Sequence, residues 1–339
     1  MTSKATLDII RVTAMIGVVA DHYLQMTGNY NLVNTGLQWG GVSVAIFFAL
    51  SAYLFGEKWR SSDNKGFEVW PFLKKRFLRI YIPLWVALFF VIALEWYAHN
   101  PFDIKTVVFN FLGLSWARPF TWAGHLWYIT MIVILYFVFL ALSRIRLDKI
   151  PLWLWVISFV GLSAIMVCLP NVFNTVSKVT IPHTMFFAAM VFSIGDRLWN
   201  FCSEHKVLII IITFGLFIGT WLLHLNGIFQ TNKGIATVLN SISGLLIFYA
   251  MAVTVKTNST SRMIGWFSGI SYELYLIHLT AIMFVRMLLP DSHSMLFYVA
   301  SVVMIILSSY LLHMVCERIN QTLTYKKDVR YISNSPHIQ

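Results

Sequence analysis

The chain has 339 residues, of which 58% are hydrophobic and 12% are charged, and its mean hydropathy is +0.72. These values exclude an ordinary soluble domain and indicate a polytopic membrane protein. The formal net charge of +11 does not indicate a nucleic-acid partner, because membrane proteins collect basic residues in their cytoplasmic loops. The three cysteines are far apart and predict neither a disulfide framework nor a zinc site.

Residues 7–27 are apolar enough to enter a bilayer and yet include Asp8, Arg11, Asp21 and His22. A charge near the middle of a membrane helix costs at least about 2.5 to 3.5 kcal/mol, so such groups usually face a partner or a water-filled cavity. Arg11 and His22 project within roughly 20° of each other and lie about 16 Å apart along the axis. One face therefore carries a cation and an imidazole, whereas Asp21 points about 100° away from His22 and is not expected to pair with it.

Several further apolar runs approach the roughly 18 to 20 residues that a helix needs to cross a bilayer. The predicted fold class is therefore all-α, a polytopic membrane bundle of about ten transmembrane helices. The candidate spans lie near residues 7–27, 38–56, 77–97, 125–142, 152–169, 184–200, 207–224, 235–255, 264–289 and 295–316. Residues 104–123 fall between two spans, and we expect a re-entrant or interfacial segment there.

Basic residues predict the orientation of the bundle. Most lysines and arginines fall on one side of the predicted spans, and the positive-inside rule then places both termini in the cytoplasm. We expect one membrane domain over residues 1–320 and a short cytoplasmic tail over residues 321–339. The first apolar segment is long and lacks a small-residue cleavage pattern, so we interpret it as a retained helix rather than a signal peptide.

A basic run, Lys74-Lys75-Arg76 with Arg79, opens the third span. A positive-inside anchor explains such a run. Arg76 and Arg79 also share one helix face, and planar guanidinium groups suit bidentate contacts with phosphate. The hypothesis for this mouth of the bundle is therefore a phosphorylated cytosolic donor.

Polar residues also occur in the first and later spans. Histidine titrates near neutral pH and suits a general base, although a lone histidine in a membrane helix such as His22 more often serves as an interhelical hydrogen-bonding group. Tyr275 and His278 are one helical turn apart, so they can present a hydroxyl and an imidazole to the same cavity. Glu95 and Glu273 are further carboxylates whose partners the sequence does not name.

Three common catalytic patterns are absent from the sequence, namely a Walker A loop, a GxSxG elbow and an HExxH helix. Their absence counts against an ATP-driven pump, a serine hydrolase and a zinc protease. A transporter or a flippase for a lipid-linked saccharide stays open as the alternative class. That alternative predicts internal pseudo-symmetry and paired broken helices, and no convincing repeat is visible.

Taken together, five short motifs resemble the acyltransferase-3 family of integral membrane acyltransferases over residues 5–316. The matches are Leu7-Asp8-x-x-Arg11 followed by His22, Phe47-Phe48-Ala49-Leu50-Ser51, Arg76-x-x-Arg79, His125-Leu-Trp-Tyr and Tyr275-Leu-Ile-His278. Two positions depart from the family pattern, which often has glycine at Ala52 and proline at Leu279.

This resemblance implies an O-acyltransferase that takes an acyl group, usually acetyl, from cytosolic acyl-coenzyme A. The expected acceptor is a hydroxyl of a saccharide or lipid-linked glycan at the outer side of the bacterial inner membrane. His22 corresponds to the catalytic histidine of the family. The residues expected to bind donor or substrate are Arg11, Arg76, Arg79, Ser51, His125, Tyr275 and His278.

The resemblance also indicates which molecules the enzyme binds, but it does not decide the acyl group or the reaction intermediate. We expect contacts with acyl-coenzyme A, a glycan acceptor and membrane lipids, with no tightly bound cofactor, no metal and no nucleic acid. We also expect a stand-alone enzyme without a fused SGNH hydrolase-like domain. Succinyl in place of acetyl, and an acyl-histidine intermediate in place of direct transfer, remain open at this point.

Overall fold

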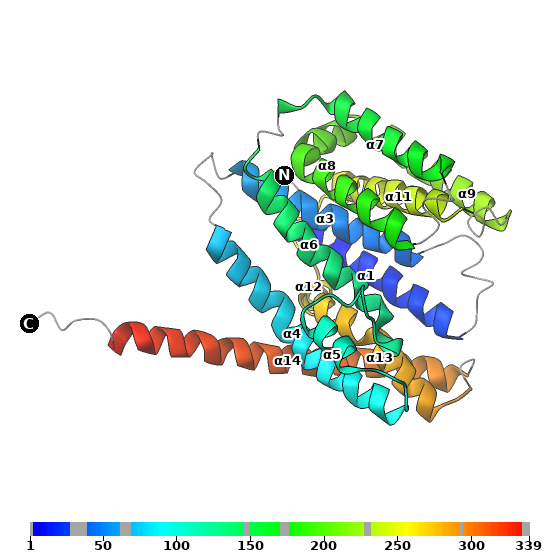
Figure 1. Cartoon of the computed structure of the whole chain (residues 1–339). Coiled ribbons are helices and arrows are strands. Elements are labelled where there is room, and N and C mark those ends of the chain that lie inside the picture. The colour runs from blue at the N-terminus through cyan, green and yellow to red at the C-terminus, as the bar shows by residue number, and fades with distance from the viewer. Residues whose placement is uncertain are drawn as a thin grey trace, which may run out of the picture. The chain divides into compact units, whose positions relative to one another are not determined.

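The computed structural model describes residues 3–27, 39–61, 69–145, 149–169, 176–226, 232–291 and 294–333. These residues form helices joined by short connections, and no strand occurs among them (Figure 1). The all-α prediction is confirmed. The chain folds as two compact units, the first comprising Met1–Phe67 with Tyr128–Ser271 and the second comprising Glu68–Trp127 with Tyr272–Gln339.

The first unit is built around two helices, α3 and α11. Its helices are α1 (Lys4–Thr27), α3 (Trp39–Ser61), nearly all of α6 (Trp127–Leu142), α7 (Leu152–Cys168), α8 (Val176–Glu204), α9 (Lys206–Leu225), α11 (Lys233–Thr254) and α12 (Arg262–Gly269). Helix α3 packs against α1, α8 and α11, while α11 also contacts α7, α8 and α9. Helix α1 additionally packs against α11 and α12.

Small residues allow α3 and α11 to approach closely. A Cβ atom added at Gly244 would lie 2.5 Å from the Cβ of Ala45, and one at Gly41 would lie 2.3 Å from Nδ2 of Asn240. Glycine and alanine at such crossings let two membrane helices bring their backbones together and gain van der Waals contact. The first unit therefore depends on these positions remaining small.

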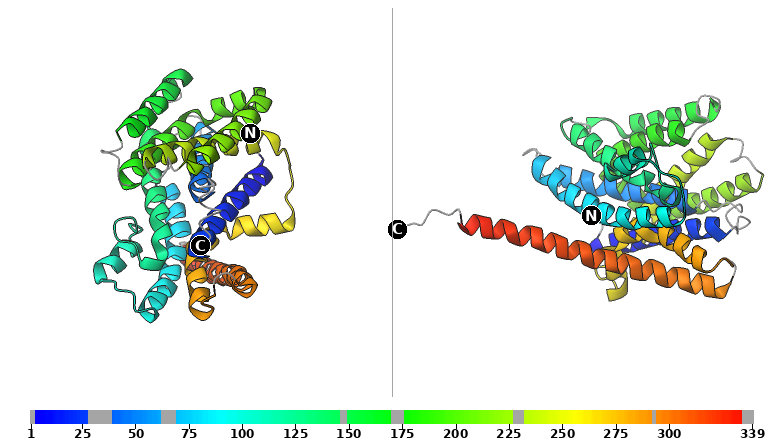
Figure 2. Two further views of the ribbon diagram at one scale, coloured as in Figure 1. Left: turned by 90° about the vertical axis from the view of Figure 1, so that its right-hand side faces the viewer. Right: turned by 60° about the horizontal axis from the view of Figure 1, so that its bottom comes forward.

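The second unit consists of α4 (Val69–Tyr97), α5 (Ile104–Phe111), the 3₁₀ turn η1 (Thr121–Leu126), α13 (Ser271–Leu288, from its second residue) and α14 (Met295–Ser333). Helix α4 contacts α5, η1 and α14. The Tyr81 hydroxyl donates to the Leu112 carbonyl at 3.0 Å, and Trp85 Nε1 donates to the Phe111 carbonyl at 2.9 Å. Helix α14 is a single long helix (Figure 2) and continues past residue 320.

The predicted spans all fall on helices, but these helices differ in length and polarity. Among the described residues, six helices are long and apolar enough to cross a membrane: α3, α4, η1 with α6, α9, α11 and α14. Helices α12 and α13 add a seventh span if this pair, bent by 69°, is counted as one. Of the remaining predicted spans, α7 has only 17 residues, and ionisable side chains lower the hydropathy of α1 and α8.

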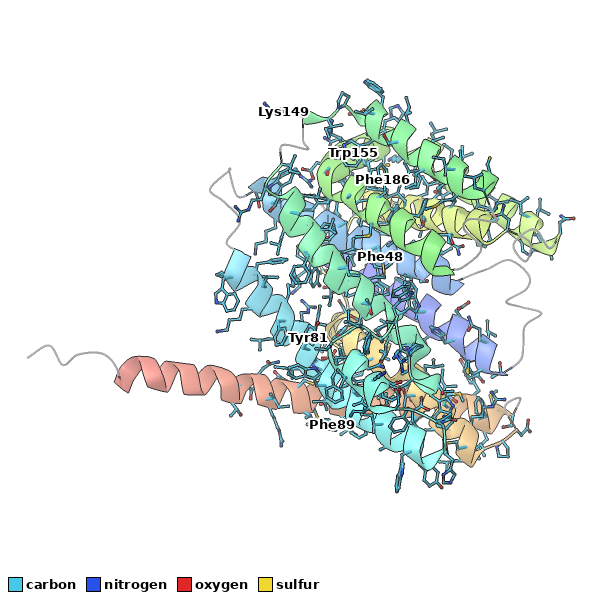
Figure 3. The ribbon with its side chains drawn as sticks, in the orientation of Figure 1. Phe48, Tyr81, Phe89, Lys149, Trp155 and Phe186 are labelled. Carbon is cyan, nitrogen blue, oxygen red and sulfur yellow. The ribbon has the colours of Figure 1, made fainter. Side chains whose placement is uncertain are left out.

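Exposed apolar side chains mark the surfaces that lipid would cover. On α9, Val207, Ile211 and Phe214 are each at least 62% exposed, and Phe89 of α4 is 66% exposed. Figure 3 labels Phe89 on its helix. In contrast, Trp155 and Phe186 pack between α7 and α8 with ring centroids 5.7 Å apart. Apolar surface of this extent is typical of helices in contact with a bilayer, so the chain is a multi-pass membrane protein.

The segment at 104–123 contains only the eight-residue helix α5 before the turn η1. Asp103 caps α5 by accepting from the Thr106 amide at 2.7 Å, and it also pairs with Arg118 at 2.8 Å. Asn110 Nδ2 donates to the carbonyls of Thr106 and Arg118. A helix of eight residues is about 12 Å long and cannot cross the bilayer, whereas the re-entrant or interfacial placement stays a prediction, as does the division at residue 320.

Candidate active site

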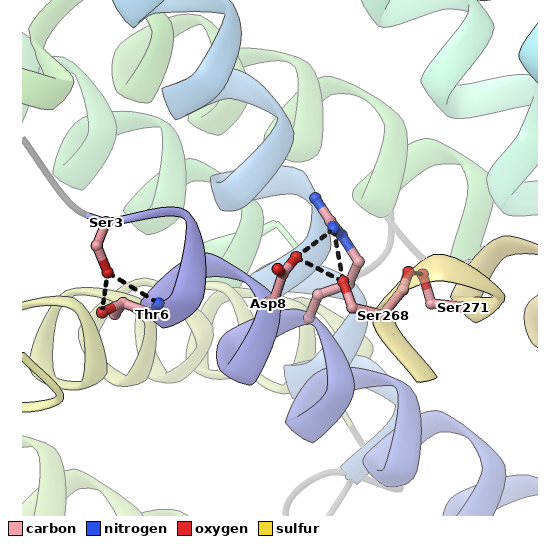
Figure 4. Close-up of polar contacts among 6 residues, drawn as sticks. Ser3, Thr6, Asp8, Ser268 and Ser271 are labelled. Atoms are coloured by element: carbon pink, nitrogen blue, oxygen red, sulfur yellow. Dashed lines mark hydrogen bonds and ion pairs between the residues drawn. The ribbon is translucent and has the colours of Figure 1, made fainter. Parts of the chain in front are cut away.

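The charged residues near the start of α1 form one compact cluster. Arg11 Nη1 donates to Asp8 Oδ1 at 3.1 Å and to Ser268 Oγ at 2.8 Å, while the Ser268 hydroxyl donates to the same Asp8 oxygen at 2.6 Å (Figure 4). Asp8 and Ser268 are buried, and Arg11 is half-buried. Each charge of this buried pair therefore has a hydrogen-bonding partner, as such pairs require.

Asp21, the neighbour of His22, serves a different partner. Its carboxylate accepts from Gln25 Nε2 at 2.7 Å and from the backbone N–H of Gly40 near the start of α3. The first amides of a helix have no partner within the helix and carry a partial positive charge, so a carboxylate is favourable there. Asp21 thus joins α1 to α3.

His22 lies on α1 eleven residues after Arg11 and is half-buried. Its ring hydrogen-bonds to the carbonyl of Val18, one turn earlier on the same helix. A carbonyl only accepts, so the ring nitrogen that faces it carries the hydrogen, and the other nitrogen of a neutral imidazole carries the lone pair. His22 is therefore held in one tautomer.

Two of the sequence motifs meet at Tyr128 in the first unit. The ring of Tyr128 lies 4.9 Å from that of Phe48 and 6.2 Å from that of Phe47. Its hydroxyl forms a hydrogen bond with the side chain of Ser51, and it lies within electrostatic range of Arg11. Ser51 therefore contacts the motif that begins at His125 through the tyrosine that ends it.

The basic run in the second unit lies near the start of α4. Lys74, Lys75 and Arg79 are exposed, whereas Arg76 is half-buried with its guanidinium carbon 5.6 Å from the centroid of the Phe72 ring. The aromatic face attracts the cation and restricts its motion. Arg76 and Arg79 lie one turn apart, as the sequence predicts.

His125, Tyr275 and His278 form a buried cluster in the second unit. The His125 and His278 rings are 4.7 Å apart, and the Tyr275 ring is 5.4 Å from His125 and 6.0 Å from His278. The Tyr275 hydroxyl donates to the His125 carbonyl. The three residues are between 0% and 5% exposed, so the structure brings together two motifs that are 150 residues apart.

Backbone carbonyls assign the tautomers of the two histidines. His278 Nδ1 lies 3.1 Å from the Leu274 carbonyl oxygen and 2.9 Å from that of Tyr275, and His125 Nε2 lies 3.3 Å from that of Leu276. Since carbonyls only accept, these nitrogens carry the hydrogens. The lone pairs of the neutral rings then belong to Nε2 of His278 and Nδ1 of His125.

The structure also supplies the partners of the two isolated carboxylates. Glu95 is 1% exposed and accepts from the Trp122 amide at 2.6 Å and from Asn100 Nδ2 at 2.7 Å. Glu273 on α13 accepts from His313 Nδ1 on α14 at 3.0 Å. Glu95 thus holds the start of η1, the turn that carries His125, and Glu273 joins the last two helices.

A family model described as an acyltransferase domain matches residues 4–314. The chain belongs to the acyltransferase-3 family. No curated protein and no solved structure matches the chain significantly. The match covers nearly the whole chain and includes residues of both units, so the chain is a membrane acyltransferase.

The predicted site residues of this acyltransferase are divided between its two units. Arg11, His22 and Ser51 belong to the first unit, and Arg76, Arg79, His125, Tyr275 and His278 belong to the second. One residue that holds these side chains was missed, namely Ser268 beside Arg11, and the sequence did not name the partner of Glu95, which is the Trp122 amide of η1. The only signal for Ser268 is its position three residues before the Ser271-Tyr272 pair that leads into the last motif.

Neither a metal site nor a disulfide is part of the described structure. Within the ranges given above, no group of three histidine, cysteine or carboxylate side chains is arranged to hold a metal ion. The three cysteines are free, with Cys168 exposed and the other two buried. The predicted site residues carry guanidinium, imidazole and hydroxyl groups, a set suited to binding anions and moving protons.

Proposed function

We propose that this acyltransferase transfers an acetyl or other short acyl group from cytosolic acyl-coenzyme A to a hydroxyl of a cell-surface or lipid-linked saccharide. The acceptor lies at the outer side of the bacterial inner membrane, and both termini lie in the cytoplasm. The donor is consumed as a substrate, and no tightly bound cofactor takes part. Family membership supports the transfer of an acyl group, and the basic residues of the inner loops support the orientation.

The observation that carries the proposal is the position of Arg11 and His22 on one continuous helix. Both lie on α1, which runs unbroken from Lys4 to Thr27. Eleven residues correspond to about 16 Å of helix, which is comparable with the reach of an extended pantetheine arm. A donor whose phosphates lie near Arg11 therefore brings its thioester to the level of His22.

His22 then acts as the general base. The lone pair of its imidazole accepts the proton of the acceptor hydroxyl while the oxygen attacks the thioester carbonyl. The resulting tetrahedral intermediate collapses, the carbon–sulfur bond breaks, and the thiolate of coenzyme A takes the proton from the imidazolium. The products are an O-acyl ester and the free thiol, with His22 returned to its neutral form.

The remaining predicted residues bind rather than react. The exposed cations at the start of α4, together with Arg76, suit the phosphates of a donor that arrives from solution, since they are accessible and of one sign. Ser51, with Tyr128, and the cluster of His125, Tyr275 and His278 supply hydroxyl and imidazole groups suited to hydrogen bonds with donor or acceptor.

A transporter or flippase remains the competing function for the same bundle. Transporter folds with inverted repeats place broken helices in pairs, whereas the described residues contain a single bent pair, α12 with α13. Family membership favours acyl transfer over transport. The two functions differ in whether a covalent bond forms, which an experiment can detect directly.

Acetyl-coenzyme A labelled in the acetyl group should be given to membranes that contain the wild type or His22→Ala, followed by mass spectrometry of the membrane glycans. The proposal predicts an acetyl ester on a glycan with the wild type and none above background with the variant. Labelled glycan at the same level in both membranes would reject His22 as the base. Movement of a lipid-linked glycan without any ester would instead support transport.

A further inference from the structure

Ser268 links the charged pair of α1 to a distant part of the first unit. It lies near the end of α12, and its side chain is buried, with 4% of the residue exposed. Its hydroxyl donates to Asp8 Oδ1 at 2.6 Å and accepts from Arg11 Nη1 at 2.8 Å (Figure 4). The single hydrogen therefore goes to the anion and a lone pair goes to the cation.

The backbone around Ser268 is fixed at both ends of its helix. The Ser271 hydroxyl donates to the Ser268 carbonyl at 2.9 Å. At the other end, Ser261 caps α12 by accepting from the Ile264 amide at 3.2 Å. Because α12 also packs against α1, the Ser268 hydroxyl is presented to Asp8 and Arg11 in one defined place.

This contact influences how Arg11 and Asp8 can pair. A guanidinium and a carboxylate gain most from two parallel hydrogen bonds, and residues three apart on a helix are close enough to form them. In that arrangement the guanidinium would face its own carboxylate. Ser268 instead donates to the same Asp8 oxygen that accepts from Arg11, and the Ser268 oxygen accepts from the same Nη1 atom of Arg11. These two contacts oppose a two-point pair between Arg11 and Asp8.

We propose that Ser268 is a positioning residue that directs the Arg11 guanidinium toward the phosphate groups of the acyl-coenzyme A donor. This inference rests on the proposed function, in which Arg11 contacts the donor. Without the hydroxyl, the single contact between Arg11 and Asp8 becomes a two-point pair, in which the guanidinium faces its own carboxylate rather than the donor. Donor affinity then falls, whereas proton transfer at His22 is unaffected.

The test is steady-state acetyl transfer by the full chain in membranes over a range of acetyl-coenzyme A concentrations. Ser268→Ala is expected to raise the donor KM about tenfold, because it removes a hydrogen bond to a charged group, and to leave kcat within about twofold. Ser268→Thr keeps the hydroxyl and should restore the wild-type KM. Thr6→Val is the matched control, since it removes a hydroxyl of α1 that bonds to Ser3 and to the Val255 carbonyl.

An unchanged donor KM in Ser268→Ala, or an equal rise in Thr6→Val, overturns the inference, because Ser268 would then only join α12 to α1. If Ser268→Ala does not accumulate in the membrane, the near-isosteric Ser268→Cys, with its weak donor, replaces it with the same expected result.

Arg11→Ala separates this inference from the proposed function. If Arg11→Ala leaves the donor KM unchanged, the donor role of Arg11 in the proposed function fails. If it raises the KM and Ser268→Ala does not, only the role of Ser268 fails. In the Arg11→Ala background, adding Ser268→Ala should produce no further rise in KM, whereas an additional rise would show that Ser268 does not act through Arg11.

Discussion

The polar clusters of the two units are held by different kinds of partner. In the first unit, carboxylates organise the cluster, with Asp8 pairing with Arg11 and Asp21 accepting from the Gly40 amide. In the second unit, His125, Tyr275 and His278 all donate to backbone carbonyls. The cluster on α1 therefore contains charged groups that hydrogen-bond to one another or to backbone amides. The cluster of His125, Tyr275 and His278 consists of side chains whose orientation is set by hydrogen bonds to backbone carbonyls.

This difference suggests where substitutions affect chemistry and where they affect geometry. Removing one member of a buried charge pair leaves the other uncompensated, which has a large effect. Removing a donor to a carbonyl leaves a neutral acceptor, and the typical loss is about 1 kcal/mol. Changes around α1 should therefore be more severe than changes around His125.

The largest expected effect is that of His22→Ala on acyl transfer. Loss of a general base lowers turnover by about 10²- to 10⁴-fold, and the protein should remain in the membrane at the wild-type level. His205→Ala, at an exposed histidine that stacks on Phe201, is the control and should retain full activity. Turnover of His22→Ala within tenfold of the wild type would place the base elsewhere, and the His125 cluster would then be the next candidate.

Gly40→Ala tests whether Asp21 organises the contact between α1 and α3. The new Cβ would lie 2.4 Å from Asp21 Oδ2, so the carboxylate must move, and such overpacking costs about 1 to 3 kcal/mol. We expect a lower melting temperature in detergent. Gly215→Ala is the matched control, because nothing lies within 4 Å of its added Cβ. Equal melting temperatures for Gly40→Ala and the wild type would contradict the role of Asp21.

A smaller effect is expected for Tyr275→Phe, which removes the hydrogen bond to the His125 carbonyl. A loss of about 1 kcal/mol corresponds to about a fivefold decrease in kcat/KM for acyl transfer. Tyr272→Phe is the control on the same helix, since the Tyr272 hydroxyl donates to the Ile80 carbonyl at 2.9 Å. A decrease as large as that of His22→Ala would show that Tyr275 does more than orient the cluster.

The smallest effect concerns the cap of α5, where a carboxylate accepts from the backbone. The Thr106 amide, followed by its hydroxyl and Arg118, lowers the pKa of Asp103 below its ordinary value of 3.8. A lowered pKa means that the cap stabilises α5 above the unfolded-state pKa, and that this stabilisation is lost as the pH falls through the folded-state pKa.

Hydrogen exchange at the Thr106 amide, corrected for the intrinsic rate, should therefore show protection at pH 6 that decreases below about pH 4. The Gly234 and Ile235 amides are the internal control, because the Asn232 side chain that caps α11 does not titrate. Protection of the Thr106 amide that stays constant with pH would show that Asp103 does not cap the helix.

The sequence predicts helices and the residues on one helix face better than it predicts contacts between distant parts of the chain. The apolar runs predicted the helices, and the 3.6-residue period placed Arg11 and His22 on one face. Hydropathy alone did not separate the long apolar helices from the others, since α7 is short and α1 and α8 carry ionisable groups.

The contacts that hold the site were not predictable in the same way. Ser268 is 257 residues from Arg11, and its position just before the last motif does not indicate that it contacts the first helix. Likewise, Glu95 binds the backbone amide of Trp122, and any residue type other than proline supplies such an amide. The sequence shows which side chains are costly to bury, whereas only the fold shows what compensates them.

In the proposed mechanism, α1 separates donor binding, at Arg11, from proton transfer, at His22. Equilibrium binding of labelled acetyl-coenzyme A to the wild type, Arg11→Ala and His22→Ala in detergent distinguishes these two roles. We expect wild-type affinity for His22→Ala, despite its much lower turnover, and an affinity at least about tenfold weaker for Arg11→Ala. Weakened binding by His22→Ala together with wild-type binding by Arg11→Ala would contradict this mechanism.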